Sequence, residues 1–372
     1  MRFVAAFLVF FCHSSAQAFY ADDELAEATM RVGIGFGWMG VAFFFVLSGF
    51  VLTWSARPED SLTLFWRRRF FKIFPNHFVT WFAAVLLAIA AGEGFSVTQT
   101  GPSLVLVHAW VPDMEVINAL HIPSWSLSCE LLFYAAFPWL LRWVGRIRPA
   151  WLWASAGAVV VLIVAVPLTA QVLLPQLPRV PWFPMSVWHY WAVYTAPPVR
   201  LLEFVLGIIM ARIVISGRWI NLGRGPAFLT LAIGCVVQWS LVPSPWAMVA
   251  PTAVPLALLI AAAARDDARG RVTRLGSRPM IWLGNVSFAM YLLHLLVLHY
   301  GHLLLGPERR WSTLSAVGIQ AALLLVTVAL SGLLHRFVER PAMRRWSAPR
   351  RRERLGLLAE TVGDAITTRR MS

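Results

Sequence analysis

Charged residues are scarce in this chain of 372 residues: Asp, Glu, Lys and Arg make up 13%, whereas hydrophobic residues make up 59%. An ordinary soluble domain carries about 25% charged residues, so this composition excludes a soluble globular fold and a disordered chain. The mean hydropathy of +0.67 indicates a helical protein that crosses a membrane several times. With about 20 residues per span, ten spans would fill more than half the chain and leave no room for a large soluble domain.

Cysteine and lysine are also rare. Cys12, Cys129 and Cys235 are scattered in apolar runs, which argues against a disulfide framework and a zinc site, and we expect no metal. Lys72 is the only lysine, so that arginine supplies 31 of the 32 cations. The net charge of +14 does not indicate nucleic-acid binding, because the cations cluster between apolar runs as topology signals do. The expected partner is the lipid bilayer, with no nucleic acid.

The apolar runs predict an all-α, polytopic membrane protein with about ten transmembrane helices. The runs lie near residues 3–19, 34–53, 76–92, 126–145, 150–170, 199–216, 226–243, 246–264, 281–303 and 312–334. A shorter apolar segment, 103–111, is bounded by prolines and predicts a re-entrant or interfacial piece. If the N-terminus is cytoplasmic, 27 of the 32 cations fall on cytoplasmic segments and five on the other side. The positive-inside rule therefore favours ten spans with both termini in the cytoplasm.

Two further segments have alternative interpretations. Residues 1–18 end in Ala16-Gln17-Ala18 and are typical either of a cleaved signal peptide or of a retained first span. The stretch 168–198, on the predicted outer side, is rich in proline and tryptophan. This composition fits an interfacial cap, and it also fits a wall for a glycan or lipid-linked acceptor.

Ionisable side chains inside apolar spans mark candidate functional sites, because a charge in lipid is costly. They are His13, Glu130, Glu203, His294 and His299. Arg2 and His13 are eleven residues apart, so an α-helix places them on one face, about 16 Å apart along its axis. Histidine can take and return a proton near neutral pH, but a lone histidine on an apolar helix is more often a hydrogen-bonded packing residue. Glu203 lies near Arg200, which favours a structural ion pair.

A cluster of cations interleaved with aromatic residues precedes the third apolar run. It contains Arg67, Arg68, Arg69 and Lys72. The pattern fits headgroup binding and topology, and equally a clamp for a phosphorylated cytosolic ligand, since arginine binds phosphate through a bidentate fork. Arg69 and Lys72 are spaced i, i+3 and would share one helix face.

Several motifs in this chain occur together and in a fixed order. They are Arg2 with His13, Gly40 to Phe50, Arg69 to Pro75, Trp125 to Tyr134, Gly284 through Ser287 to Tyr291 and His294, and Glu339-Arg340-Pro341. In these motifs the chain resembles the acyltransferase 3 family of bacterial membrane acyltransferases, which O-acetylate surface polysaccharides, lipopolysaccharide O-antigen and macrolides. The resemblance predicts a transmembrane domain at 1–341 and a basic cytoplasmic tail at 342–372. It favours a retained first span, because cleavage would remove Arg2 and His13.

The resemblance implies acyl-CoA, expected to be acetyl-CoA, as the donor from the cytoplasm. The implied acceptor is a hydroxyl of a glycan, a lipid-linked sugar or a macrolide that arrives from the other side. The implied location is the cytoplasmic (inner) membrane of a bacterium. No soluble hydrolase-like domain is appended, as some family members have, so we expect the chain to act alone or with a separate partner.

Residue roles follow from the same resemblance. We assign His13 as the general base, with an acyl-histidine intermediate as the alternative. Arg2 is expected to bind donor phosphate or stabilise negative charge, and Glu130 to orient His13 or the acceptor. Binding of the CoA phosphates is assigned to Arg68, Arg69 and Lys72, and Ser48, Trp125 and Ser126 are expected to line the pocket. Lys72 stands where the family has a second arginine, and a lysine cannot form the bidentate fork.

A competing hypothesis is a proton-coupled transporter or flippase in which Glu130 and Glu203 relay protons. It predicts solute movement that does not depend on CoA. Neither inverted halves nor paired broken helices are visible in the sequence, so we favour the acyltransferase.

Overall fold

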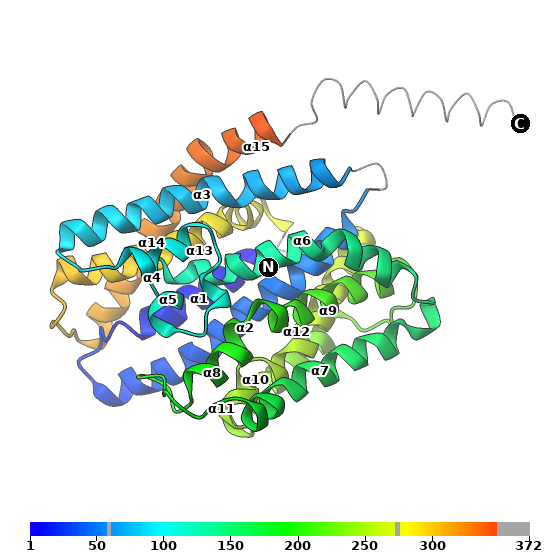
Figure 1. The fold of residues 1–372 in the computed structure, drawn as a ribbon, viewed down its shortest axis with the longest axis horizontal. Coiled ribbons are helices and arrows are strands. Elements are labelled where there is room, and N and C mark those ends of the chain that lie inside the picture. The colour runs from blue at the N-terminus through cyan, green and yellow to red at the C-terminus, as the bar shows by residue number, and fades with distance from the viewer. Residues whose placement is uncertain (58–60, 272–275, 348–372) are drawn as a thin grey trace, which may run out of the picture.

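The computed structural model describes residues 1–57, 61–271 and 276–347 and is an elongated bundle of helices (Figure 1). These described residues contain no β-strand, and the all-α prediction is confirmed. Of the predicted tail at 342–372, the first residues complete helix α15 (Arg340–Trp346). Residues 348–372 lie outside the described part of the chain.

Within the described residues, ten longer helices coincide with the ten predicted apolar runs. They are α1 (Arg2–Ser15), α2 (Asp23–Trp54), α3 (Leu62–Ala91), α6 (Trp125–Gly145), α7 (Leu152–Leu173), α9 (Pro197–Ile215), α10 (Arg224–Ser240), α12 (Ala250–Ala268), α13 (Arg278–Leu305) and α14 (Thr313–Leu334). Shorter elements connect them: α4 (Val97–Leu104), η1 (His108–Trp110), α5 (Met114–Ile117), η2 (Ile122–Ser124), η3 (Pro149–Trp151), α8 (Val187–Tyr190), η4 (Trp191–Thr195), α11 (Ser244–Ala247) and η6 (His335–Glu339).

Six helical segments of the described chain are long and apolar enough to cross a membrane: Asp23–Trp54, Leu62–Ala91, Pro149–Leu173, Ser244–Ala268, Arg278–Leu305 and Thr313–Trp346. They make this a multi-pass membrane protein, but they do not confirm the predicted count of about ten spans. Helices α1 and α10 have 14 and 17 residues, whereas a span needs about 20. Helices α6 and α9 carry charged residues, Glu130 and Arg142 in the first and Arg200, Glu203 and Arg212 in the second.

Helices α2 and α9 cross at a point where their backbones touch. A Cβ atom on Gly49 of α2 would lie 2.0 Å from the carbonyl oxygen of Phe204, and one on Gly207 of α9 would lie 2.0 Å from that of Val46. Small residues permit such an approach, and close van der Waals packing is what holds helices together in a lipid environment. This crossing brings the charged start of α9 against the middle of the bundle.

Helix α1 packs between α2 and α13 and buries two of its faces. Ala5 and Val9 belong to the main hydrophobic core, while Ala6 and Phe10, on another face of α1, pack in a second cluster with residues of α13. All four side chains are at most 3% exposed. Removal of a leader peptide up to residue 18 would therefore take away part of the folded core.

The segment from α4 to η2 enters the bundle instead of crossing it. The His77 Nε2 atom on α3 lies 3.0 Å from the carbonyl oxygen of Ser103 and 3.1 Å from that of Leu104. His77 is 14 residues before the end of α3, which is about 21 Å along the helix axis. At the far end of the segment, His121 Nε2 lies 3.0 Å from the carbonyl oxygen of Leu292 on α13. These contacts anchor an irregular segment deep in the bundle, just before α6 begins.

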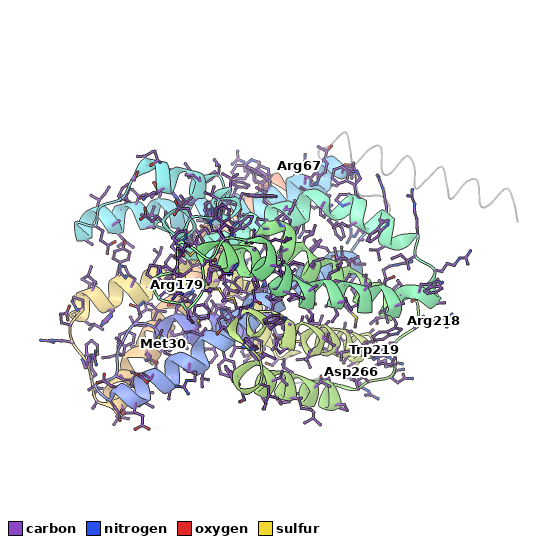
Figure 2. All side chains as sticks on the ribbon, turned by 60° about the horizontal axis from the view of Figure 1, so that its bottom comes forward. Met30, Arg67, Arg179, Arg218, Trp219 and Asp266 are labelled. Atoms are coloured by element: carbon purple, nitrogen blue, oxygen red, sulfur yellow. The ribbon has the colours of Figure 1, made fainter. Side chains whose placement is uncertain are left out.

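The two predicted sides of the membrane correspond to the two ends of the bundle. Figure 2 shows Arg67, Arg218 and Asp266, from segments predicted to be cytoplasmic, toward one end of the molecule. Met30 and Arg179, from the opposite side in the prediction, lie toward the other end (Figure 2). We call these the inner and the outer end.

Candidate active site

Helix α1 presents its two predicted site residues to two different cavities. Arg2 lines one cavity, of about 190 Å³, which we call the inner cavity. His13 lines another, of about 160 Å³, which we call the outer cavity. One short helix thus reaches both cavities, with Arg2 at its first residue and His13 eleven positions later.

The inner cavity gathers charged and polar side chains from six elements, which are α1, α2, α3, α6, α13 and η6. They are Arg2, Ser48, Arg69, Lys72, Ser126, Glu130, Tyr134, Asn285, Ser287, Tyr291, His335 and Glu339. Six residues predicted from the sequence are therefore brought together here. Arg68 also lies on α3, but it is not among the lining residues, so this part of the predicted phosphate clamp does not face the cavity.

Glu130 is held by two hydroxyl groups in the inner cavity. Tyr134 OH donates to its Oε2 atom at 3.0 Å, and Ser48 Oγ lies 3.4 Å from its Oε1 atom. Ser48 comes from α2 and Tyr134 from the next turn of α6, so the carboxylate joins the two helices. Since His13 lines the other cavity, these contacts do not support the prediction that Glu130 orients His13.

Lys72 is paired within the protein. Its Nζ atom forms an ion pair with Glu339 Oε1 of η6 and lies 5.3 Å from the centre of the Phe288 ring. Glu339 also accepts a hydrogen bond from Asn76 Nδ2 at 2.8 Å and is only 2% exposed. Lys72 therefore fastens α3 to η6 at the cavity wall. The sequence motif groups it with Arg69 as a phosphate ligand, but the structure gives it a buried carboxylate partner.

Arg69 is supported by aromatic rings. Its guanidinium carbon lies 5.6 Å from the centre of the Phe65 ring and 5.8 Å from that of Tyr134. Stacking of this kind holds the plane of an arginine while its N–H donors stay available for an anion. Arg69 and Arg2 are thus the two arginines that line the inner cavity.

The outer cavity is walled mainly by aromatic rings. His13 and Cys12 line it together with Trp38, Trp125, Trp182, Phe183, Tyr190, Tyr194 and Tyr291. Four of these rings, Trp182, Phe183, Tyr190 and Tyr194, come from the proline- and tryptophan-rich stretch 168–198. That stretch therefore forms part of the wall of this cavity.

The two cavities meet at a thin partition. Val41 of α2 and Tyr291 of α13 line both of them. The Tyr291 hydroxyl donates to the carbonyl oxygen of Pro123 at 3.1 Å and lies 2.8 Å from Ser126 Oγ. Trp125 faces the outer cavity and its neighbour Ser126 the inner one. The start of α6 therefore stands between them, where the re-entrant segment has placed it.

His13 does not stand alone on its helix. Its Nδ1 atom lies 3.0 Å from the carbonyl oxygen of Val9 and 3.1 Å from Nε2 of His294 on α13. His294 is 1% exposed, and its own Nδ1 atom lies 2.6 Å from the carbonyl oxygen of Tyr291. Sequence reasoning singled out His294 as an ionisable residue in a span and part of a motif, but gave it no role in the site.

The remaining intramembrane ionisable residues have structural partners. Arg200 Nη2 lies 2.9 Å from Glu203 Oε2, and both side chains are 1% exposed, which confirms the predicted ion pair. His299 Nε2 lies 2.8 Å from Glu93 Oε1 near the outer ends of α13 and α3, outside either cavity. Within the described residues, no three His, Cys, Asp or Glu side chains are arranged to hold a metal ion.

Tyr291 is the main residue that sequence reasoning left without a role. It lines both cavities and contacts the ring of His294, with 5.7 Å between ring centres. Its signal in the sequence was its place three residues before His294, which puts both on one face of α13.

Comparison with known proteins identifies the family of this chain. The chain is 41% identical to the acyltransferase MdmB of Streptomyces mycarofaciens over 356 residues, which cover 92% of this chain and 90% of the relative. It is 28% identical to the exopolysaccharide production protein ExoZ of Rhizobium meliloti, over 88% of this chain and 96% of the relative. No solved structure matches the chain significantly. Residues 1–336 match the acyltransferase domain of the acyltransferase 3 family, so this chain belongs to that family and is a membrane acyltransferase.

Proposed function

We propose that this enzyme transfers an acyl group, expected to be acetyl, from cytosolic acyl-CoA to a hydroxyl of a carbohydrate or macrolide acceptor. The proposed location is the cytoplasmic membrane of a bacterium. The observation that carries the proposal is the position of α1, with Arg2 in the charged inner cavity and His13 in the aromatic outer cavity. A donor and an acceptor that come from opposite sides of a membrane need two such chambers with a thin partition between them.

The inner cavity suits the donor because it offers arginine to anionic phosphates. Arg2 and Arg69 line it, and arginine binds phosphate through parallel, charge-assisted hydrogen bonds. Lys72, neutralised by Glu339, keeps the wall of the cavity in place. The CoA phosphates would thus stay at the inner end while the thioester reaches the partition near Tyr291.

The outer cavity suits a bulky acceptor with hydroxyl groups. Binding pockets for organic ligands are lined mainly by apolar and aromatic groups, with a few polar groups that fix orientation. Here the rings of Trp182, Phe183 and Tyr190 are combined with the polar groups of His13 and Asn118. The name of the relative ExoZ, an exopolysaccharide production protein, also supports a carbohydrate acceptor.

His13 acts as the general base in the proposed reaction. Its Nε2 atom takes the proton of the acceptor hydroxyl while the hydroxyl oxygen attacks the thioester carbonyl carbon. A C–O bond forms, the C–S bond breaks, and His13 returns the proton to the sulfur of the departing CoA. The products are the acyl ester and free CoA. Proton transfer of this kind contributes about 10²–10⁴-fold to a rate.

The test is the His13→Ala variant in membranes supplied with radiolabelled acetyl-CoA and an extract that contains the acceptor. We expect label transfer to fall by about 10²–10⁴-fold, because the base is lost. His299→Ala is the matched control, since His299 lies outside both cavities and pairs with Glu93. Transfer at the wild-type rate by a folded His13→Ala variant would overturn the assignment.

The acceptor class has its own test. Surface glycans and small metabolites of cells with and without the gene are compared by mass spectrometry. We expect one carbohydrate-containing species to lose one acetyl mass when the gene is deleted. If no such species changes, the acceptor class proposed here is wrong.

A further inference from the structure

The contact between His13 and His294 joins the first helix to α13 inside the membrane. The Nδ1 atom of His13 and the Nε2 atom of His294 are 3.1 Å apart, and their ring centres are separated by 4.9 Å. His294 is 1% exposed, and it does not line the outer cavity, which His13 does. His294 can therefore act on a substrate only through His13.

Two backbone carbonyl groups determine where the protons of this pair lie. Because a carbonyl oxygen can only accept, the Nδ1 atom of His294, 2.6 Å from the Tyr291 oxygen, must carry a proton. A neutral histidine has one N–H, so Nε2 of His294 is an acceptor. The Nδ1 atom of His13 faces this acceptor and the Val9 oxygen, and must itself be the donor. The unprotonated nitrogen of His13 is then Nε2.

We propose that His294 is a positioning residue for acyl transfer: it holds the His13 ring with Nδ1 protonated and Nε2 available as the base. This inference rests on the proposed function, because it supplies the orienting partner of the base. When Nε2 takes the proton of the acceptor hydroxyl, the His13 ring becomes positive, and its Nδ1–H bond to His294 becomes a stronger, charge-assisted bond. The third group of a serine-protease triad serves its histidine in this way, by fixing tautomer and orientation.

Two substitutions of His294 separate this role from simple packing. The amide of asparagine takes approximately the place of Nδ1 in histidine, and the amide of glutamine approximately that of Nε2. His294→Asn can still bind the Tyr291 carbonyl but cannot reach His13, whereas His294→Gln can offer His13 an acceptor oxygen. We expect His294→Asn to lower kcat by about 10²–10⁴-fold, because a histidine base held in the wrong tautomer loses most of its contribution to the rate. His294→Gln should recover at least about a tenth of the wild-type kcat.

The matched control is His302→Asn. His302 lies on the same helix, is 8% exposed, and contacts Phe19 instead of His13. We expect its kcat to stay within about twofold of wild type. Because the inner cavity is not changed, the Kd for acetyl-CoA should be the same in all three variants.

A direct readout does not depend on acyl transfer. Nitrogen NMR of the 15N-histidine-labelled protein in lipid nanodiscs reports which ring nitrogen of His13 is protonated, with His13→Ala to assign the signals. We expect protonated Nδ1 in the wild type and in His294→Gln, and a mixture of tautomers in His294→Asn.

The proposal is overturned if the His13 tautomer is the same in wild type and His294→Asn, or if Asn and Gln lower kcat equally. It is also overturned if both weaken acetyl-CoA binding, because His294 then only supports the fold. Failure of the proposed function is distinct: the wild type would transfer no acyl group, while the NMR comparison would still decide the tautomer.

Discussion

The three cations Arg2, Arg69 and Lys72 that line the inner cavity differ in their contacts with the rest of the protein. Lys72 is bound to Glu339, which also accepts from Asn76. Arg2 is exposed and Arg69 is stacked between aromatic rings. A phosphate that enters the cavity would therefore be bound mainly by the two arginines, because Glu339 already balances the charge of Lys72.

This division predicts different effects for two arginine substitutions. Arg2→Gln removes a donor from the cavity wall and should raise the KM for acetyl-CoA about tenfold, the cost of roughly one charged hydrogen bond. Arg68→Gln removes a cation of the same sequence cluster that does not line the cavity, and should change the KM less than twofold. Steady-state kinetics on purified protein measure both. A larger effect of Arg68→Gln than of Arg2→Gln would contradict this description of the donor site.

The crossing of helices α2 and α9 supports both cavities. Val41 of α2 lines both of them and Ser48 of α2 lines the inner one, while α9 carries the buried Arg200. The pair packs through glycines, and neither Gly49 nor Gly207 has room for a methyl group. Arg200 in turn lies 5.0 Å from the centre of the Phe45 ring and 5.3 Å from that of Tyr194 in the outer cavity. The spacing of this crossing thus sets the shape of the aromatic wall.

We predict that Gly207→Ala destabilises the protein by about 1–3 kcal/mol, the usual cost of forcing extra volume into a packed core. The new Cβ would lie 2.0 Å from the Val46 oxygen, so that a backbone must move. Thermal unfolding in detergent measures the loss. Gly157→Ala on α7 is the control, since nothing lies within 4 Å of a Cβ there. Equal melting temperatures for both variants would refute the tight crossing.

The two ends of the whole molecule differ in positive charge. Among the described residues, most cations lie on segments predicted to be cytoplasmic, which are found toward the inner end, whereas Arg179 of the stretch that lines the outer cavity lies toward the other end (Figure 2). The positive-inside rule relates this distribution to membrane orientation. The proposed reaction therefore requires the inner end to be cytoplasmic.

Cysteine labelling tests this orientation. In a variant without the three native cysteines, Glu308→Cys between α13 and α14 should react with a membrane-impermeant maleimide in intact cells. Arg148→Cys between α6 and α7 should react only after the membrane is permeabilised. Both positions are exposed in the structure, so reactivity reports the side of the membrane. The reverse pattern would contradict the cytoplasmic placement of the donor site.

Much of the fold could be predicted from the sequence, because hydropathy and charge are local properties that add up along a span. Each predicted run is a helix, and the segment 103–111 contains no long helix. The predicted number of membrane crossings is not confirmed, because six helical segments of the described chain are long and apolar enough to cross. Helices such as α1 and α9 are short or charged, and they are sheltered by neighbouring helices that a single run of sequence does not show.

By itself, the sequence determined the all-helical membrane architecture, the family, and the presence of Arg2 and His13 on one face of the first helix. Only the tertiary structure decided which polar groups share a cavity. The pairs His13 with His294 and Lys72 with Glu339 join residues 281 and 267 positions apart. Such pairs depend on how each helix is rotated and how closely it packs, and these properties come from contacts between helices, not from the pattern within one.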